Sequence, residues 1–328
     1  QMKNIVISGS SGFVGNNLIK FYKQKKIRLT CLSSQKINIK KTKNLSWITL
    51  NKDYSDLKNQ VINFDIIYFC TGIGTISKSS IYDENKRENK IFKNLIRLIK
   101  KNSRPCKIIF LSSYSVYGNT KKKAKETDVC KPLSQYAKNK IIYEKELKVL
   151  SKLSRVKVII LRLSSLYGPY LKKQVMWDTL SKIKNKNNLN VSGTGNEQRD
   201  FLYIDDAVKA LNLVASKKNL EDFTIFNCGV GKSIKIRYLL NLILKITKIK
   251  KKLYFNNLSS LENPNSLKVN IDKLKKIGWK CNTEIYLGLN KYLKWFKKKI
   301  NIGFVIRDTN WHGGINYFRS LITAIMLK

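Results

Sequence analysis

The sequence predicts an α/β fold in which a mostly parallel, doubly wound sheet is covered by helices on both faces. Short runs rich in Val and Ile alternate with stretches of helical period, which is the pattern of βαβ units. The chain has 328 residues and 43% hydrophobic content, enough to bury a large core. Continuous apolar strands are typical of parallel sheets, because both of their faces are covered.

Each element is predicted from its local pattern. Apolar runs predict strands at 4–8, 27–32, 65–70, 107–112 and 156–162. Length and spacing of the apolar residues predict helices at 16–25, 84–102 and 135–152. After Leu166 the segments become shorter and are broken by glycines, and they end in an amphipathic stretch at 285–298. This change of rhythm predicts a second, smaller lobe.

Composition excludes several classes of function. The formal net charge is +44, but the lysines are scattered along the chain without a nucleic-acid-binding motif, so we expect no specific nucleic-acid partner. Six separated cysteines and a single histidine, His312, give no metal motif. No apolar run approaches the roughly 20 residues that span a bilayer, and we expect a cytoplasmic protein without a membrane segment. Because the chain has only one histidine, we expect any acid–base chemistry to use Tyr, Lys, Asp or Glu.

A glycine-rich loop joins the first predicted strand to the first predicted helix. Three glycines at this place allow a tight turn, close approach of the backbone to a pyrophosphate, and close packing of helix on strand. The spacing is Gly-x-x-Gly-x-x-Gly, which differs from the standard Gly-x-Gly-x-x-Gly fingerprint. The prediction therefore depends mainly on the position of the glycines between a first strand and a first helix. We expect a Rossmann-type dinucleotide-binding domain. Its cofactor contacts are predicted at Gly9, Ser11, Gly12, Phe13, Val14 and Gly15.

The end of the second predicted strand favours NADP over NAD. A NAD-selective site places an acidic residue there, about 20 positions after the glycines, to accept hydrogen bonds from the adenine ribose. Here the position falls on Ser33, followed by Ser34 and Lys36. Hydroxyl groups and a cation suit a 2′-phosphate better, unless these residues only begin a loop.

Tyr136 and Lys140 are the candidate acid–base pair, and both are also expected to contact the cofactor. Their spacing places both side chains on one face of the helix predicted at 135–152. Other Tyr–Lys pairs share this spacing by chance, but only Tyr136 follows a strand that ends in hydroxyl residues. A buried ammonium lowers the pKa of a neighbouring phenol, so such a tyrosine can exchange a proton with a sugar hydroxyl or ketone. Ser113 is expected to hydrogen-bond the reacting oxygen.

These residues together resemble the extended short-chain dehydrogenase/reductases, the NAD-dependent epimerase/dehydratase family, over residues 3–298. After the glycine loop, 112–118 reads Ser-Ser-Tyr-Ser-Val-Tyr-Gly, which is similar to the family's Ser-Ser-x-x-Val-Tyr-Gly. The Tyr136/Lys140 pair and a segment at 162–169 follow in the family's order. The resemblance implies a nucleotide-sugar substrate, a homodimer and a role in surface polysaccharide synthesis.

The resemblance also implies a set of substrate-binding residues. Arg199, in the segment 193–201, matches an arginine that contacts the substrate's diphosphate in this family. Ser165 stands where the family commonly has Asn, which puts the substrate contacts there in doubt. The expected contacts are Ser113, Tyr114, Ser115, Ser165 and Arg199.

Departures from the family narrow the expected reaction. The 4,6-dehydratases carry Asp-Glu where this chain has Tyr114-Ser115, so dehydration is disfavoured. A nucleotide-sugar epimerase and a 4-ketoreductase both remain, each moving hydride between a nicotinamide and a sugar carbon. The alternative is a non-catalytic NADP-binding sensor of the same fold, which the intact Ser113, Tyr136 and Lys140 set argues against.

The predicted organisation has three parts. Residues 1–166 form the dinucleotide-binding domain, and 167–299 form a substrate-binding lobe partly interleaved with it. Residues 300–328 form an extension. Its strand-like start and the glycines at Gly313 and Gly314 resemble the beginning of a GT-B glycosyltransferase domain. An amphipathic helix that packs on the main domain or on a dimer partner is the equal alternative.

Overall fold

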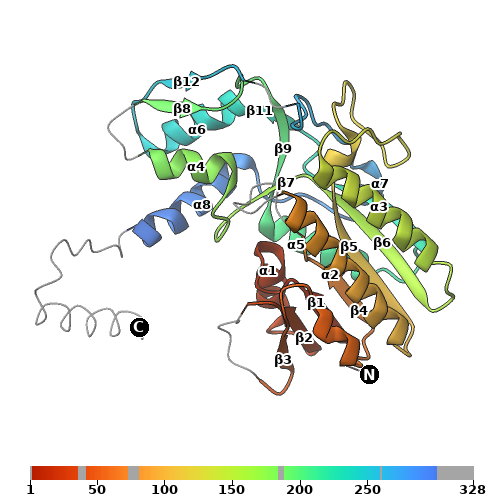
Figure 1. Ribbon diagram of the computed structural model, residues 1–328. Helices are drawn as coiled ribbons and strands as arrows, with labels where there is room; N and C mark the ends of the chain where they lie inside the picture. The colour runs from red at the N-terminus through yellow and green to blue at the C-terminus, as the bar shows by residue number, and fades with distance from the viewer. Residues whose placement is uncertain (1, 36–41, 73–80, 184–187, 259–260, 301–328) are drawn as a thin grey trace, which may run out of the picture.

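A seven-stranded parallel sheet forms the body of the protein (Figure 1). The computed structural model describes residues 2–35, 42–72, 81–183, 188–258 and 261–300. The strand order is β10-β6-β5-β4-β1-β2-β3, and every neighbouring pair in it is parallel. The strands are β1 (Asn4–Ser8), β2 (Arg28–Ser33), β3 (Leu45–Thr49), β4 (Ile66–Phe69), β5 (Cys106–Ser113), β6 (Val156–Leu163) and β10 (Phe223–Cys228). The predicted fold class is confirmed.

Helices cover both faces of this sheet. Successive strand residues point to opposite faces, so Ile5 and Ile7 of β1 join one buried cluster and Val6 joins another. The first cluster includes side chains from α1 (Phe13–Tyr22) and α5 (Ile204–Ser216). The second includes side chains from α2 (Ile81–Lys101) and α3 (Gln135–Leu150). Helix α3 therefore packs beside α2, although the two helices are separated by β5 in the sequence.

A smaller lobe stands over the carboxyl end of the sheet, at the upper left of Figure 1. Its strands form a three-stranded sheet, β11-β9-β7, and a two-stranded sheet, β12-β8. Its strands are β7 (Ser165–Tyr167), β8 (Leu189–Val191), β9 (Gln198–Tyr203), β11 (Ser233–Lys235) and β12 (Leu253–Phe255), and its helices are α4 (Gln174–Lys182), α6 (Ile236–Thr247) and α8 (Ile285–Ile300). The short helix α7 (Asp272–Lys276) contacts β10. The segment at 204–228 returns to the main sheet between parts of this lobe.

The predicted elements agree well with the observed ones, with two omissions in the main sheet. β1 has the predicted bounds, and the other predicted strands and helices differ from the observed ones by a few residues at their ends. β3 was missed because it is the outermost strand of the sheet, and its sequence, Leu-Ser-Trp-Ile-Thr, mixes polar and apolar residues. β10 was missed because it lies among the lobe segments and pairs with β6 across a long separation. Lys36 and the extension after residue 300 lie outside the described residues.

Two negative findings apply to the described part of the chain. None of its helices is both long and apolar enough to cross a bilayer. It also contains no group of three or more His, Cys, Asp or Glu side chains that could hold a metal ion.

Candidate active site

The glycine loop leaves its backbone open to a ligand. Gly9 adopts a φ of +67°, and the Gly12 amide donates to the Gly9 carbonyl at 2.9 Å, which closes the turn. A Cβ on Gly15 would lie 2.3 Å from the Gly9 oxygen, so only glycine allows this packing of helix on strand. No side chain caps α1, whose first amides thus remain available to an anion. Phe13 and Val14 pack partly against the core below.

A buried tyrosine supports the loop from beneath. The Tyr54 hydroxyl accepts a hydrogen bond from the Gly9 amide at 3.2 Å and donates to the Leu32 carbonyl at 3.3 Å. The Ser10 hydroxyl also donates to the Leu32 carbonyl, at 2.7 Å. Sequence reasoning missed Tyr54, because its contacts are 22 and 45 residues away. These bonds fix the loop to the end of β2.

The loop forms one wall of a cavity at the carboxyl ends of β1, β2 and β4. Ligands bind at this edge in open α/β sheets, because the connections diverge there. The cavity runs from the glycine loop past Thr71 and Gly72 to α2. Its polar lining includes Ser11, Ser34, Lys52, Thr71, Arg87 and Glu88. Glycines at the loop, a helix N-terminus and cations on the far wall fit the pyrophosphate and ribose groups of a dinucleotide.

Of the residues predicted to select NADP, Ser33 is buried, whereas Ser34 lines the cavity. Ser33 is buried, and its hydroxyl donates to the Ser11 hydroxyl at 2.8 Å while accepting from the Gln35 amide at 3.0 Å. Ser34 lines the cavity, as do Lys52 and Arg87, two cations that sequence reasoning did not select. Ser33 therefore organises the turn, and other groups present charge to the cavity.

Tyr136 and Lys140 share one face of α3, as their spacing predicted. The helix is capped by Ser134, whose hydroxyl accepts from the Ala137 amide at 3.2 Å. The Lys140 Nζ lies 5.3 Å from the Tyr136 ring centre. It also pairs with the Glu88 Oε1 at 3.3 Å, and only 3% of the lysine side chain and 6% of the glutamate side chain are exposed.

The surroundings of Lys140 keep its ammonium charged. Burial acts to lower the pKa of Lys140, but Glu88 and, to a smaller degree, Tyr136 and Glu144 outweigh burial and raise it. A Cβ on Gly72 would lie 3.3 Å from the Lys140 Nζ. Since Gly72 and Glu88 line the cavity, the Lys140 ammonium lies close behind the cavity wall.

The expected substrate contacts gather where β5 ends. The Tyr114 and Ser165 hydroxyls are 2.7 Å apart, which joins the end of β5 to β7. Burial raises the pKa of Tyr114 to about 12, while the nearby Arg199 acts in the opposite direction. The Ser113 hydroxyl accepts from the Ser115 amide at 3.2 Å and from its hydroxyl at 2.8 Å. No hydrogen bond joins Ser113 to Tyr136 among the described residues.

A buried polar network lies behind these residues. Glu144 of α3 accepts from the Ser112 hydroxyl at 2.5 Å and pairs with the Arg162 guanidinium at 2.6 Å. Arg162 also donates to the Tyr117 hydroxyl at 2.8 Å, which in turn donates to Asn227 at 2.7 Å. Several residues of the segments at 112–118 and 162–169 thus hold α3, β5 and β6 together.

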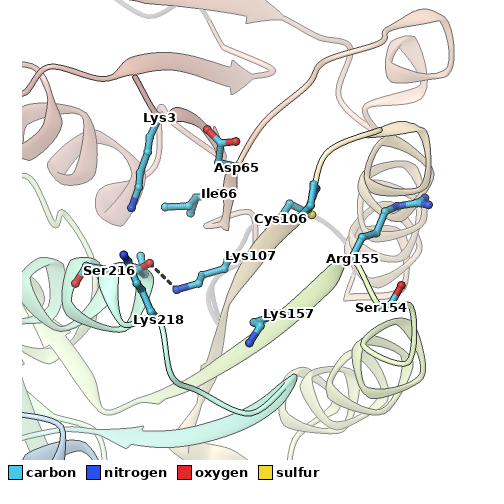
Figure 2. A pocket seen from close by; sticks show the side chains of 12 residues that line it. Lys3, Asp65, Ile66, Cys106, Lys107, Ser154, Arg155, Lys157, Ser216 and Lys218 are labelled. Carbon is cyan, nitrogen blue, oxygen red and sulfur yellow. Dashed lines mark hydrogen bonds between the residues drawn. The ribbon is translucent and has the colours of Figure 1, made fainter. Parts of the chain in front are cut away.

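A second pocket lies at the opposite edge of the sheet, at the amino ends of β1, β4, β5 and β6. Figure 2 shows Lys3, Lys107 and Lys157 around it. The Lys107 Nζ donates to the carbonyls of Ala215, at 3.1 Å, and Lys217, at the end of α5. Lys157 similarly donates to the Leu220 carbonyl at 3.2 Å. These cations cap carbonyl groups, as basic side chains often do at helix C-termini.

The chain matches a known family and is similar to proteins named for reactions of nucleotide sugars. A model of the NAD dependent epimerase/dehydratase family matches residues 5–229. The chain is 26% identical to the uncharacterized UDP-glucose epimerase YtcB of Bacillus subtilis, over 83% of this chain and 91% of that protein. It is 26% identical to dTDP-4-dehydro-6-deoxyglucose reductase of Escherichia coli, over 90% of this chain and 98% of the reductase.

The fold is shared with solved structures. UDP-glucuronic acid 4-epimerase from Bacillus cereus, solved with UDP-glucuronic acid and NAD, superposes with a TM-score of 0.81. The superposition covers 90% of this chain and 99% of the epimerase at 21% identity.

Proposed function

The chain belongs to the NAD dependent epimerase/dehydratase family, and from this premise we propose that it epimerises a nucleotide sugar or reduces its 4-keto form. Ser113, Tyr136 and Lys140 form the proposed catalytic set, and the sugar product supplies surface polysaccharide synthesis. The observation that carries the proposal is the buried Lys140, whose ammonium is near both the Tyr136 ring and Gly72, a residue of the cavity that begins at the glycine loop.

Tyr136 acts in this proposal as the proton carrier. Its hydroxyl takes the proton from a sugar hydroxyl during oxidation and returns it to the oxygen during reduction. The Lys140 ammonium stabilises the phenolate by its charge, and burial strengthens that interaction. Ser113, at the end of β5, hydrogen-bonds the reacting oxygen. A bound nicotinamide supplies the hydride acceptor and donor.

Arg199, Tyr114 and Ser165 form the proposed substrate side. Arg199 is positively charged and lies close enough to influence Tyr114, whose hydroxyl already contacts Ser165. A guanidinium suits a diphosphate because it can donate two parallel hydrogen bonds. The names of the relatives, which include UDP- and dTDP-linked sugars, support a nucleoside diphosphate sugar as the substrate class.

Epimerisation and reduction differ in the fate of the keto intermediate. An epimerase keeps it and returns the hydride to its other face, whereas a reductase receives a keto sugar and releases the alcohol. Both reactions use Tyr136 in the same way, and relatives with both names match this chain. A sensor without catalysis would not need a buried ammonium beside Tyr136, which disfavours that alternative.

NADP is the proposed cofactor, with NAD as the alternative. No carboxylate stands at Ser33, and Lys52 and Arg87 line the cavity near Ser34. Cations there would attract the 2′-phosphate. Isothermal titration with NADPH and NADH tests this choice. We expect tighter binding of NADPH, and equal or tighter binding of NADH would overturn the preference.

The proposed homodimer uses the outer surfaces of α2 and α3. Tyr82 is 74% exposed on α2, and Ile142 and Val149 are 49% and 66% exposed on α3. Light scattering should give twice the chain mass for the wild type and a smaller mass for Ile142→Glu. A monomeric wild type would contradict the dimer.

The test of the reaction uses purified protein, NADPH or NADH, and a panel of UDP-, GDP- and dTDP-linked sugars and their 4-keto-6-deoxy forms. Loss of NADPH with a product two mass units heavier would identify a reductase. A new isomer without net loss of cofactor would identify an epimerase. Equal turnover by Tyr136→Phe would overturn the catalytic assignment, and cofactor binding without turnover would favour the sensor.

A further inference from the structure

Glu88 is an acidic residue in an unusual place. The chain has 65 basic and 21 acidic residues, and only four acidic side chains are buried in the part that the structure describes: Glu88, Glu144, Asp200 and Asp206. Glu144 pairs with Arg162, and the two aspartates accept hydrogen bonds from backbone amides. Glu88 differs from these three because it lines the cofactor cavity.

Three contacts fix the register between α2 and α3 at this point. Asn139 donates to Asn85 at 2.9 Å, Lys140 pairs with Glu88 at 3.3 Å, and Tyr143 donates to Asn89 at 2.5 Å. The Phe92 and Tyr143 rings also stack, with centres 4.2 Å apart. Because the Glu88–Lys140 pair lies between these contacts, neither helix can shift without breaking them.

The Glu88–Lys140 pair is closely covered by its neighbours, and both Glu88 and the covering Gly72 line the cavity. A Cβ on Gly72 would lie 3.3 Å from the Lys140 Nζ and 3.7 Å from the Glu88 Oε1, so the chain after β4 covers the pair closely. The Phe110 ring centre lies 5.2 Å from the Nζ on the side of β5. An ammonium in such surroundings has little contact with water and depends on its partner.

We propose that Glu88 is a positioning residue that holds the Lys140 ammonium charged and aimed past Gly72 at the cofactor and Tyr136. This inference rests on the proposed function, because it assigns Glu88 a role in the same proton transfer. The carboxylate accepts one ammonium hydrogen, and the remaining hydrogens are left for the cofactor side of the cavity. Glu88 itself exchanges no proton with the substrate.

The neighbours of Lys140 predict what happens without this carboxylate. Glu144 is already paired with Arg162. Tyr136 and Tyr143 are uncharged when protonated, and the Phe110 ring is apolar, so none of the three replaces the carboxylate. Burial would then dominate, and an ammonium in an apolar site loses its proton at a lower pH. The variant Glu88→Gln keeps the size and a hydrogen-bond acceptor while removing the charge, so it separates charge from shape.

The first measurement is the pH dependence of kcat and KM from pH 6 to 10 for wild type, Glu88→Gln and Glu88→Asp. We expect kcat of Glu88→Gln to decline with rising pH at least about one unit earlier than in the wild type, with KM little changed. Glu88→Asp should restore part of the profile because it restores the charge. Glu146→Gln, the same change at an exposed position of α3, should match the wild type. Superimposable profiles for Glu88→Gln and wild type would overturn the proposal.

A second measurement needs no turnover and keeps the two proposals separate. Thermal unfolding is followed against pH for wild type, Glu88→Gln, Lys140→Met and the double variant. Each single variant should be less stable than the wild type at pH 7, and the double variant should recover, because an unpaired buried charge costs more than no charge. The loss in Glu88→Gln should shrink as pH rises and Lys140 becomes neutral. A wild type without turnover but with this pattern would reject the enzyme and keep the charge-holding role. Additive losses independent of pH would reject the role of Glu88.

Discussion

The two edges of the main sheet each place a partly or fully buried lysine beside a pocket, but the partners of the two lysines differ. At the carboxyl edge, Lys140 meets the carboxylate of Glu88 at 3.3 Å. At the amino edge, Lys107 meets the carbonyls of Ala215 and Lys217 and no carboxylate within ion-pair distance among the described residues. Burial lowers the pKa of Lys107, and the like charges of Lys3 and Lys157 lower it further. The pKa of Lys140 is raised despite its burial.

The difference shows how one residue type gains two roles in one fold. Carbonyl dipoles hold a lysine in place, but they do not fix its charge as strongly as a carboxylate does. In a chain with 65 basic residues, the presence of a lysine at a pocket carries little information. A buried carboxylate paired with it carries more: the Glu88 side chain is 6% exposed, whereas Asp222, which pairs with Lys157 at the amino edge, is 65% exposed. The comparison therefore supports the proposed chemistry at the carboxyl edge and a structural role for Lys107 at the amino edge.

The largest expected effect separates the two lysines by activity. Lys140→Met should reduce kcat by about 100-fold or more, because the phenolate of Tyr136 loses its cation. Lys107→Met removes the same group at the other edge and should leave kcat within about twofold while costing about 1 kcal/mol of stability through lost hydrogen bonds. Steady-state kinetics and urea unfolding measure the two effects. Equal kcat losses in both variants would break the assignment of chemistry to one edge.

The next effect compares ion pairs by stability. Glu144→Gln should lower the free energy of unfolding by about 3–5 kcal/mol, because it leaves the Arg162 guanidinium, 6% exposed, without a charged partner. Asp222→Asn breaks the Lys157–Asp222 pair near the amino edge, whose side chains are 40% and 65% exposed, and should cost less than about 1 kcal/mol. Urea denaturation of both variants tests the contrast. Similar losses would mean that burial of the Glu144 pair has little energetic consequence.

A smaller effect concerns the backbone of the carboxyl edge. Gly15→Ala should weaken NADPH binding by roughly tenfold, or about 1.4 kcal/mol, because the new Cβ would meet the Gly9 carbonyl at 2.3 Å and displace the loop. Gly12→Ala should weaken it less, since its Cβ would lie 3.0 Å from the same oxygen. Fluorescence titration with NADPH gives both constants. The reverse order would show that the loop adjusts in another way.

The smallest effect is the opposite pH dependence of stability at the two edges. The pKa of Lys107 in the folded protein lies below its ordinary value of 10.5, so the folded protein loses this proton at a lower pH than the unfolded chain does. Between the two pKa values, the contribution of Lys107 to stability therefore rises with pH. Lys140 has a raised pKa, so its contribution is present below 10.5 and is lost as pH rises through the folded value. Differences in Tm between wild type and each Lys→Met variant, taken from pH 8 to 11, should change in opposite directions. If the Tm differences of the two variants changed with pH in the same direction, the two lysines would not differ in the sign of their pKa shifts.

Sequence patterns predicted those candidate residues whose motif lies within a short stretch of the chain. The glycine loop follows β1 without a gap, and Tyr136 and Lys140 are one turn apart, so each motif lies within a single element or turn. Tyr114, Ser165 and Arg199 came from family resemblance, and the structure brings the first two into contact. Glu88 and Tyr54 escaped notice, because their partners are 52 and 45 residues away.

The amino-acid sequence by itself determined the alternation of strands and helices, the glycine loop after β1 and the spacing of Tyr136 and Lys140. Apolar period, glycine positions and helical spacing act over a few residues, so they can be read along the chain. Only the tertiary structure decided that α2 lies beside α3 and thereby that Glu88 reaches Lys140. It also decided that β10 completes the sheet next to β6. The charge state of a buried lysine depends on every group packed around it, and packing joins residues that the sequence keeps apart.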